Sequence, residues 1–209
     1  MKTIAIIVSV SFSALLIIGC DDEKSDNSNT SDIPTERYST AQIDSSRTEA
    51  NPDTTILSFL RWYRNNQERL DAIPMVNNAT GMVYDSARFY SVNFDASEKY
   101  LKEFDKSGYV SAIYIDKWRK YFKNADVNFK AHPQNDGPPD YFDYDFVMHS
   151  QEFDEDFNNL DSVKVDSRGE NSHKTTALLT FISGQKLTFQ LTRHGDRWLI
   201  DQIDNASVR

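Results

Sequence analysis

The sequence of 209 residues is short of cysteine and of positive charge, and each shortage excludes something. Cys20 is the only cysteine, so no disulfide can form within the chain. The 23 Lys and Arg residues face 32 Asp and Glu residues, which gives a formal net charge of −9. Phosphate backbones and anionic lipid surfaces repel such a chain, so we expect no nucleic-acid partner.

The sequence also lacks the motifs of nucleophilic hydrolysis. It contains neither His-Glu-x-x-His nor Gly-x-Ser-x-Gly. The four histidines are scattered at His132, His149, His173 and His194. We interpret them as surface or loop residues, and we expect no catalytic residue, no metal ligand and no cofactor.

The first twenty residues have the pattern of an export signal. Lys2 precedes an apolar run over residues 4–18 that only serines interrupt, and Gly19 stands before Cys20. This run is too short to span a bilayer comfortably, because about 20 apolar residues are needed. A small residue before a cysteine resembles the bacterial lipoprotein signal, in which the cysteine is acylated, for example with palmitate, and becomes the new N-terminus.

Two other interpretations of residues 1–19 stay open, namely a retained membrane anchor and an ordinary export signal that leaves Cys20 as a stray thiol. Loss of this segment changes the net charge from −9 to −10, because Lys2 is its only charged residue. Membrane attachment then depends on acyl chains on Cys20. The acidic residues 21–23 resemble the surface-export tag of Bacteroidetes lipoproteins, whereas in an enterobacterium Asp21 favours retention at the inner membrane. We expect a lipid-anchored protein of the bacterial envelope, at the periplasmic face or the cell surface of the outer membrane.

Composition divides the rest of the chain into two parts. Residues 21–51 are rich in polar and acidic residues, with Tyr38 as the sole aromatic. Too little apolar surface is present there to offset the entropy of ordering. We therefore expect lipidated Cys20 and a disordered acidic tether over residues 20–51, followed by a single domain over residues 52–209.

Three helices are predicted in the first half of that domain. The first spans residues 52–71, with Asn51 as N-cap and a proline at the first helical position. The second begins with a capping box at residues 95–98 and ends at Gly108, and Ser111 caps the third. Their apolar faces consist of Ile56, Phe59, Leu60, Tyr63, Leu70, Tyr100, Leu101, Phe104, Ile115, Trp118 and Phe122.

The second half has a different periodicity. Residues 123–142 are predicted to be a loop, because Asn, Asp, Gly137 and two adjacent prolines oppose regular structure. Beyond residue 160 the apolar period is two, and the candidate strands are 162–166, 174–182, 186–193 and 197–203. Helices followed by an antiparallel meander predict an α+β domain with its helices across one face of the sheet.

Four segments carry a family resemblance. They are 59–63 (FLRWY), 100–111 with its Ser-Gly-Tyr, 135–145 (NDGPPDYFDYD) with Gln151-Glu152, and 198–203 (WLIDQI). Together they resemble an uncharacterised domain-of-unknown-function family of Bacteroidetes lipoproteins. The resemblance implies a cystatin-like, nuclear-transport-factor-two-like fold, in which helices pack on a curved antiparallel sheet and leave a conical pocket. It implies an envelope location but no particular chemistry.

A dense acidic set lies within residues 136–156. Its members are Asp136, Asp140, Asp143, Asp145, Glu152, Asp154, Glu155 and Asp156. Such oxygen ligands suit calcium, but EF-hand spacing is missing, and the alternative is a solvated acidic loop. Asp143 and Asp145 lie on one side of an extended segment, as paired carboxylates for acid–base chemistry require. Alternatively, this Asp-x-Asp caps backbone amides and fixes a turn.

Aromatic residues at helical spacing are core residues by default, but a conical cavity would place some of them at its mouth. The candidate ligand-binding residues are Trp62, Tyr63, Tyr114, Asp143, Asp145 and Gln151. We expect a non-enzymatic domain that binds a small ligand or an envelope protein. One alternative is a small hydrolase or isomerase that uses Asp143 or Asp145, and another is an immunity or inhibitor protein that acts through its acidic face.

Overall fold

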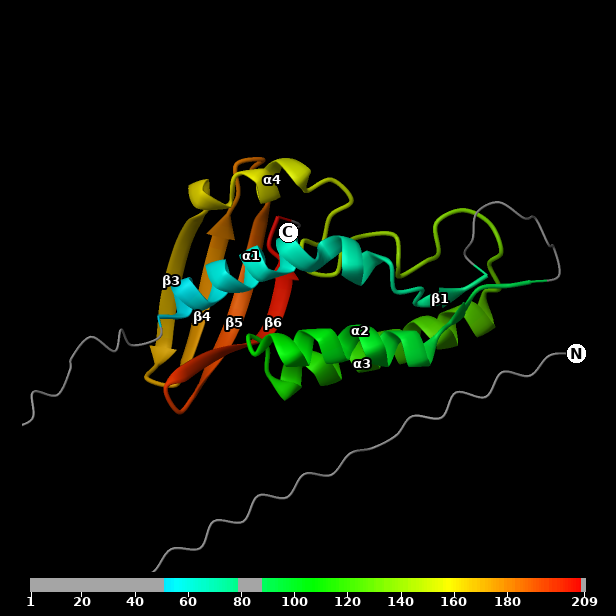
Figure 1. Ribbon diagram of the computed structural model, residues 1–209, viewed down its shortest axis with the longest axis horizontal. Helices are drawn as coiled ribbons and strands as arrows, with labels where there is room; N and C mark the ends of the chain where they lie inside the picture. The colour runs from blue at the N-terminus through cyan, green and yellow to red at the C-terminus, as the bar shows by residue number, and fades with distance from the viewer. Residues whose placement is uncertain (1–50, 79–87, 208–209) are drawn as a thin grey trace, which may run out of the picture. The chain divides into compact units, whose positions relative to one another are not determined.

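The computed structural model describes residues 51–78 and 88–207, which all belong to one compact unit. Helices and an antiparallel sheet follow one another along the chain, so the predicted α+β class is confirmed (Figure 1). The predicted signal segment, Cys20 and the tether up to residue 50 lie outside the described residues. In the described part of the chain, no helix combines the length and the apolar character needed to cross a bilayer.

The elements are three long helices, a short helical stretch and two sheets. The helices are α1 (Pro52–Asp71), α2 (Phe94–Ser107), α3 (Ala112–Ala131), α4 (Asp154–Asn158) and a single 3-10 turn (Leu160–Ser162). A small antiparallel pair consists of β1 (Val76–Asn77) and β2 (Ser91–Val92). The four-stranded antiparallel sheet has the order β3 (Lys164–Asn171), β4 (Lys174–Thr180), β5 (Lys186–His194) and β6 (Arg197–Asn205).

The first helix is as the sequence predicts. The side chain of Asn51 accepts a hydrogen bond from the backbone N–H of Asp53 at 2.9 Å, and Pro52 occupies the first turn. The apolar residues at 3–4 spacing are buried, among them Ile56 and Leu60, which are 0% exposed. The polar start and the apolar face are therefore both confirmed.

The start of α2 differs from the prediction. Asn93, not Asp95, is the N-cap, and its side chain accepts from the N–H of Ala96 at 3.1 Å. The helix consequently begins at Phe94, ahead of the expected capping box. Its end agrees with the prediction, because Gly108 adopts the left-handed conformation with φ of 73°.

The predicted loop over residues 123–142 is wrong for its first part, because α3 continues to Ala131. Ala125 and Phe129 are buried and extend the apolar face of Phe122 by another two turns. Lys123, Asn124 and Lys130 are exposed on the outer side of the helix, and α3 contains no proline. Apolar periodicity thus outweighs the local frequency of Asn and Asp.

The sheet confirms the predicted meander, with strand ends shifted by a few residues. Side chains of β4 and β5 alternate between buried and less buried positions, whereas the buried residues of β6, Ile200 and Ile203, lie three apart. The buried face of the sheet includes Ala177, Leu179, Leu187, Phe189, Leu191 and Ile200. A bulge interrupts the pairing of β5 with β6, because Gln190 pairs with Gln202 but Leu191 pairs with Ile200. Asp201 is the residue left over at this bulge.

The bulge attaches the helices to the sheet. Asp201 accepts hydrogen bonds at 2.5 Å from the hydroxyls of Ser111 and Thr192. Ser111 is also the N-cap of α3, and the adjacent Val110 forms a parallel bridge with Ile200. One carboxylate therefore fixes the start of α3 against the edge strand β6.

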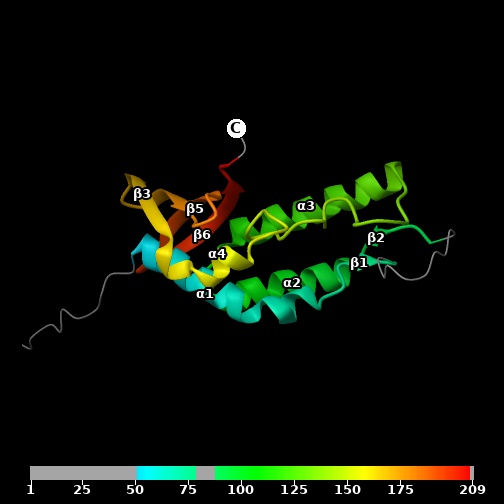
Figure 2. The ribbon, with the colours of Figure 1, turned by 90° about the horizontal axis from the view of Figure 1, so that it is seen from above.

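The helices have two relations to the sheet (Figures 1 and 2). Helix α1 crosses it and contacts β3, β4 and β6, whereas α2 and α3 pack on each other and reach the sheet beside β6. Residues 132–153, which we call the return segment, run back along α3 toward the sheet (Figure 2). The ring of Phe142 stacks on Phe122 and Phe129 of α3, with centroid distances of 5.7 and 6.3 Å.

Candidate functional site

The return segment turns sharply at Asp145. One carboxylate oxygen, Oδ1, accepts from the backbone N–H groups of Val147 at 2.9 Å and Met148 at 2.6 Å. The backbone closes the same turn, since His149 N–H donates to the Asp145 carbonyl at 2.7 Å and Asp145 N–H donates to the Ser150 carbonyl at 3.0 Å. Asp145 thus caps backbone amides and fixes a turn, as the structural alternative proposed for this Asp-x-Asp.

The second oxygen of Asp145 connects the return segment to α1. The hydroxyl of Tyr63, a residue only 1% exposed, donates to Oδ2 at 2.5 Å. Burial, together with the nearby Tyr100 and Asp145, raises the pKa of Tyr63 well above its ordinary value, so this hydroxyl keeps its proton and donates. Both oxygens of Asp145 are therefore engaged by the protein.

The charge of Asp145 is nevertheless poorly compensated. Burial raises the pKa of its carboxyl, against the lowering effect of hydrogen bonds from Tyr63, Met148 and Val147. The negative charge of Asp71 raises this pKa further. Partial burial also raises the pKa of Asp71, the last residue of α1, against the lowering effect of a hydrogen bond with Gln67.

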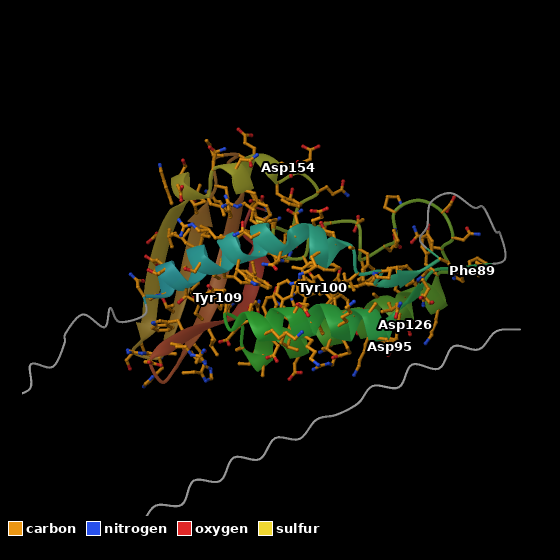
Figure 3. The ribbon with its side chains drawn as sticks, in the orientation of Figure 1. Phe89, Asp95, Tyr100, Tyr109, Asp126 and Asp154 are labelled. Carbon is orange, nitrogen blue, oxygen red and sulfur yellow. The ribbon has the colours of Figure 1, made fainter. Side chains whose placement is uncertain are left out.

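A cavity of about 350 Å³ lies between the end of α1, α2 and the return segment. Its walls are aromatic and its rim is apolar, with the carboxyl groups of Asp71 and Asp145 in the lining. The aromatic walls are Tyr63, Tyr100, Phe142, Tyr144 and Phe146. Figure 3 shows Tyr100 in this region between α1 and α2. We call this space the aromatic cavity.

An adjoining cavity of about 300 Å³ shares Asp71, Phe142, Tyr144 and Asp145 with the aromatic cavity. It is also lined by Asp143 and Gln151, and the amide of Gln151 donates to the Asp143 carbonyl at 2.6 Å. Asp143 itself is exposed. Four of the six predicted ligand-binding residues, Tyr63, Asp143, Asp145 and Gln151, therefore surround two connected spaces.

Of the other two predicted residues, Tyr114 belongs to the core and Trp62 is partly buried against it. The ring of Trp62 packs edge-on against Phe104 at 5.4 Å, and Tyr114, which is 2% exposed, stacks on the same ring at 5.8 Å. Neither lines the aromatic cavity. The expected conical pocket over the sheet is filled by side chains, because the sheet face toward α1 is buried, so the cavity lies at the helical end instead.

Sequence reasoning missed Asp71, Tyr100 and Tyr144 as lining residues. The run Tyr-Phe-Asp-Tyr-Asp-Phe over residues 141–146 is the one local signal, because aromatic and acidic residues seldom alternate in a packed core. Asp71 gives no such signal, since it reads as an ordinary polar residue at a helix end.

The remaining acidic residues do not converge. Asp156, which is 1% exposed, accepts from the N–H and hydroxyl of Ser183 at 3.0 and 2.7 Å and so fixes the β4–β5 turn. Among residues 51–78 and 88–207, no three His, Cys, Asp or Glu side chains are close enough to hold a metal ion. The calcium alternative thus finds no ligand set in this part of the chain.

His149 is the more buried of the two histidines in the return segment. It adopts a positive φ of 52°, and its Nε2 lies 3.2 Å from the Ile203 carbonyl. Its ring lies against Tyr144 and Trp118, with centroid distances of 5.9 and 6.3 Å. Burial lowers the pKa of His149, so the ring is neutral in the folded protein near pH 7.

No protein-family model matches this chain, and no curated protein does. A solved structure that is similar to it is the crystal structure of the type VI native effector–immunity complex Tae3-Tai3 from Ralstonia pickettii. The identity is 15%, the TM-score is 0.40, and the match covers 77% of this chain and 98% of the other. At these values we draw nothing about function from the likeness.

Proposed function

We propose that this chain is a lipid-anchored protein of the bacterial envelope whose folded unit binds a small ligand in the aromatic cavity. The observation that carries the binding function is the cavity itself, in which aromatic walls surround two carboxyl groups in a volume of about 350 Å³. Small-ligand sites typically combine apolar walls with a few polar groups of this kind. The anchor rests on the lipoprotein-like signal before Cys20.

Binding is favoured over acid–base catalysis because of how Asp145 is held. Its raised pKa is typical of catalytic carboxyl groups. However, Oδ1 accepts hydrogen bonds from two backbone amides, and Oδ2 accepts one from the Tyr63 hydroxyl. A general base needs an oxygen free to take a proton from substrate. Asp143, the other candidate base, is exposed.

The binding function can be tested by filling the cavity. We would screen the full-length chain in detergent against neutral, anionic and cationic fragments by ligand-observed NMR. Met75, on the apolar rim, is replaced by tryptophan (Met75→Trp), and Ile182→Trp at an exposed site is the matched control. We expect binders that Met75→Trp loses and Ile182→Trp keeps. If no fragment distinguishes the two folded variants, the aromatic cavity is not a binding site.

The anchor is tested separately. Expression in a bacterial host fed an alkyne-tagged fatty acid should label the full-length chain, and Cys20→Ser should remove the label. An unlabelled wild-type chain would show that Cys20 is not acylated.

A further inference from the structure

We infer that the ligand of the aromatic cavity is a small organic cation that carries a substituted ammonium group. This inference rests on the proposed function, because it names the ligand class of the same cavity. It follows from the charge of the lining, from the chemistry of the walls and from the hydrogen bonds that are already made.

The lining carries negative charge without a positive partner. Asp71 and Asp145 are its only charged residues, and no Lys, Arg or His of the described chain lines the cavity. The nearest basic residues on α1 are engaged elsewhere, since Arg69 pairs with Glu103 at 2.6 Å and Arg64 donates to the Phe157 carbonyl at 2.9 Å. A cation between the two carboxyl groups would supply the missing charge.

The walls suit an organic cation better than a metal ion. Five aromatic residues, three of them tyrosines, line the cavity, and the face of an aromatic ring attracts ammonium groups. A divalent metal would need several oxygen or nitrogen ligands, and the part of the chain that the structure describes brings no three such side chains together. The aromatic walls also bury the methyl or methylene groups of the ligand.

Neutral polar ligands and anions fit this lining less well than a cation does. A neutral polar ligand such as a sugar needs free donors and acceptors, but the Tyr63 hydroxyl and both oxygens of Asp145 are already paired. An anion would be repelled by both carboxyl groups. Asp71 raises the pKa of Asp145, and a bound cation would relieve this repulsion.

The test compares two probes of the same shape. Choline carries a quaternary ammonium group, and 3,3-dimethylbutan-1-ol is its neutral carbon analogue. Titration calorimetry on the full-length chain in detergent should show choline binding at least about tenfold more tightly than the alcohol, from cation–π and charge attraction. A salt titration should weaken choline binding and leave the alcohol unchanged.

Two variants locate the effect. Asp71→Asn removes one lining charge at an exposed position, and Glu68→Gln removes an exposed charge from the same helix outside the cavity. We expect Asp71→Asn to weaken choline binding by about three- to tenfold and Glu68→Gln to leave it within about twofold. Melting temperatures of both variants confirm that they fold.

The outcomes separate this inference from the proposed function. Equal affinity for choline and the alcohol, or equal effects of the two variants, overturns the cation and leaves ligand binding intact. If neither choline nor n-butylammonium binds while neutral fragments are lost in Met75→Trp, the ligand is not a cation although the cavity is a binding site. If Met75→Trp also affects no fragment, the proposed function fails as well.

Discussion

The four-stranded sheet and the return segment both pack against helices, but only the sheet has a regular backbone ladder, and the return segment depends on side-chain hydrogen bonds for its path. On the sheet, alternating apolar residues such as Leu179 and Phe189 are 0% exposed, and the backbone follows a regular ladder. The return segment is irregular, with positive φ at Tyr141 and His149, and Asp145 fixes its path through side-chain hydrogen bonds. Burial of apolar area stabilises both regions, since Phe146, Val147 and Met148 of the return segment are also buried. The return segment depends in addition on a few specific polar contacts.

The difference explains where the cavity lies. Side chains of a regular sheet interdigitate with those of the facing helix, so little space remains between the sheet and α1. A segment held at a few points by hydrogen bonds need not fill the volume around it. The aromatic cavity therefore lies beside the return segment, where packing is set by a turn and not by a repeating pattern.

The largest effect is expected in the sheet core. Phe189→Ala should lower the free energy of unfolding by about 3–5 kcal/mol, because it leaves a large cavity in a fully buried layer. Phe142→Ala, in the return segment, should have less than half this effect, since Phe142 is only partly buried and already borders a cavity. Urea unfolding of both variants measures the contrast, and equal losses would remove the distinction between the regions.

The next effect is at the turn. Asp145→Ala should cost about 3 kcal/mol, because it leaves two backbone amides and the Tyr63 hydroxyl without their acceptor. Asp143→Ala is the control, and at that exposed position the change should stay within about 0.5 kcal/mol. A similar loss in both variants would mean that acidic residues of the return segment act through general charge and not through these bonds.

A smaller effect is expected where the sheet and α3 meet. Ser111→Ala should lower stability by about 1–2 kcal/mol, through loss of the N-cap and of the bond to Asp201. Ser111→Thr keeps a hydroxyl and should retain most of the stability. If alanine and threonine behave alike in thermal unfolding, the hydroxyl at residue 111 does not hold α3 to the bulge.

The smallest effect is a pH dependence in the return segment. His149 has a lowered pKa when folded and its ordinary value of 6.5 when unfolded, so acid favours the unfolded chain. Its contribution is present above pH 6.5 and is lost as the pH falls through 6.5 toward the folded pKa. Between pH 7 and pH 6 this loss is at most about 0.7 kcal/mol, the limit set by titration of the unfolded chain. His149→Asn, which tolerates the positive φ, should remove this slope in urea titrations at the two pH values.

Local sequence signals predict most of the helices and strands. The bounds of α1 follow from Asn51, Pro52 and an apolar face, and the meander follows from period two with short turns. The start of α2 differs from the prediction because Asn93 is as good a cap as Asp95, and the side chain of Asn93 accepts from the N–H of Ala96. The last turns of α3 were missed because Asn and Asp were weighed above the spacing of Ala125 and Phe129.

The candidate site was only half predictable. Tyr63 and Asp145 were both named from sequence, but nothing local indicated that they bond to each other. Trp62 and Tyr114 were predicted to line a pocket but pack on Phe104, because side-chain direction around a helix depends on what packs against it. Asp71 lines the cavity only because the return segment passes beside the end of α1.

The bond between Tyr63 and Asp145 joins residues 82 positions apart, and this separation has a kinetic consequence. Helices α2 and α3 lie between the two partners in sequence, so closing the bond carries the entropy cost of a long loop. Opening the same bond breaks no strand pair. We expect the amides of Val147 and Met148 to exchange with solvent deuterium faster than those of β5. On this basis we expect the return segment to be the wall of the aromatic cavity that forms last and opens first.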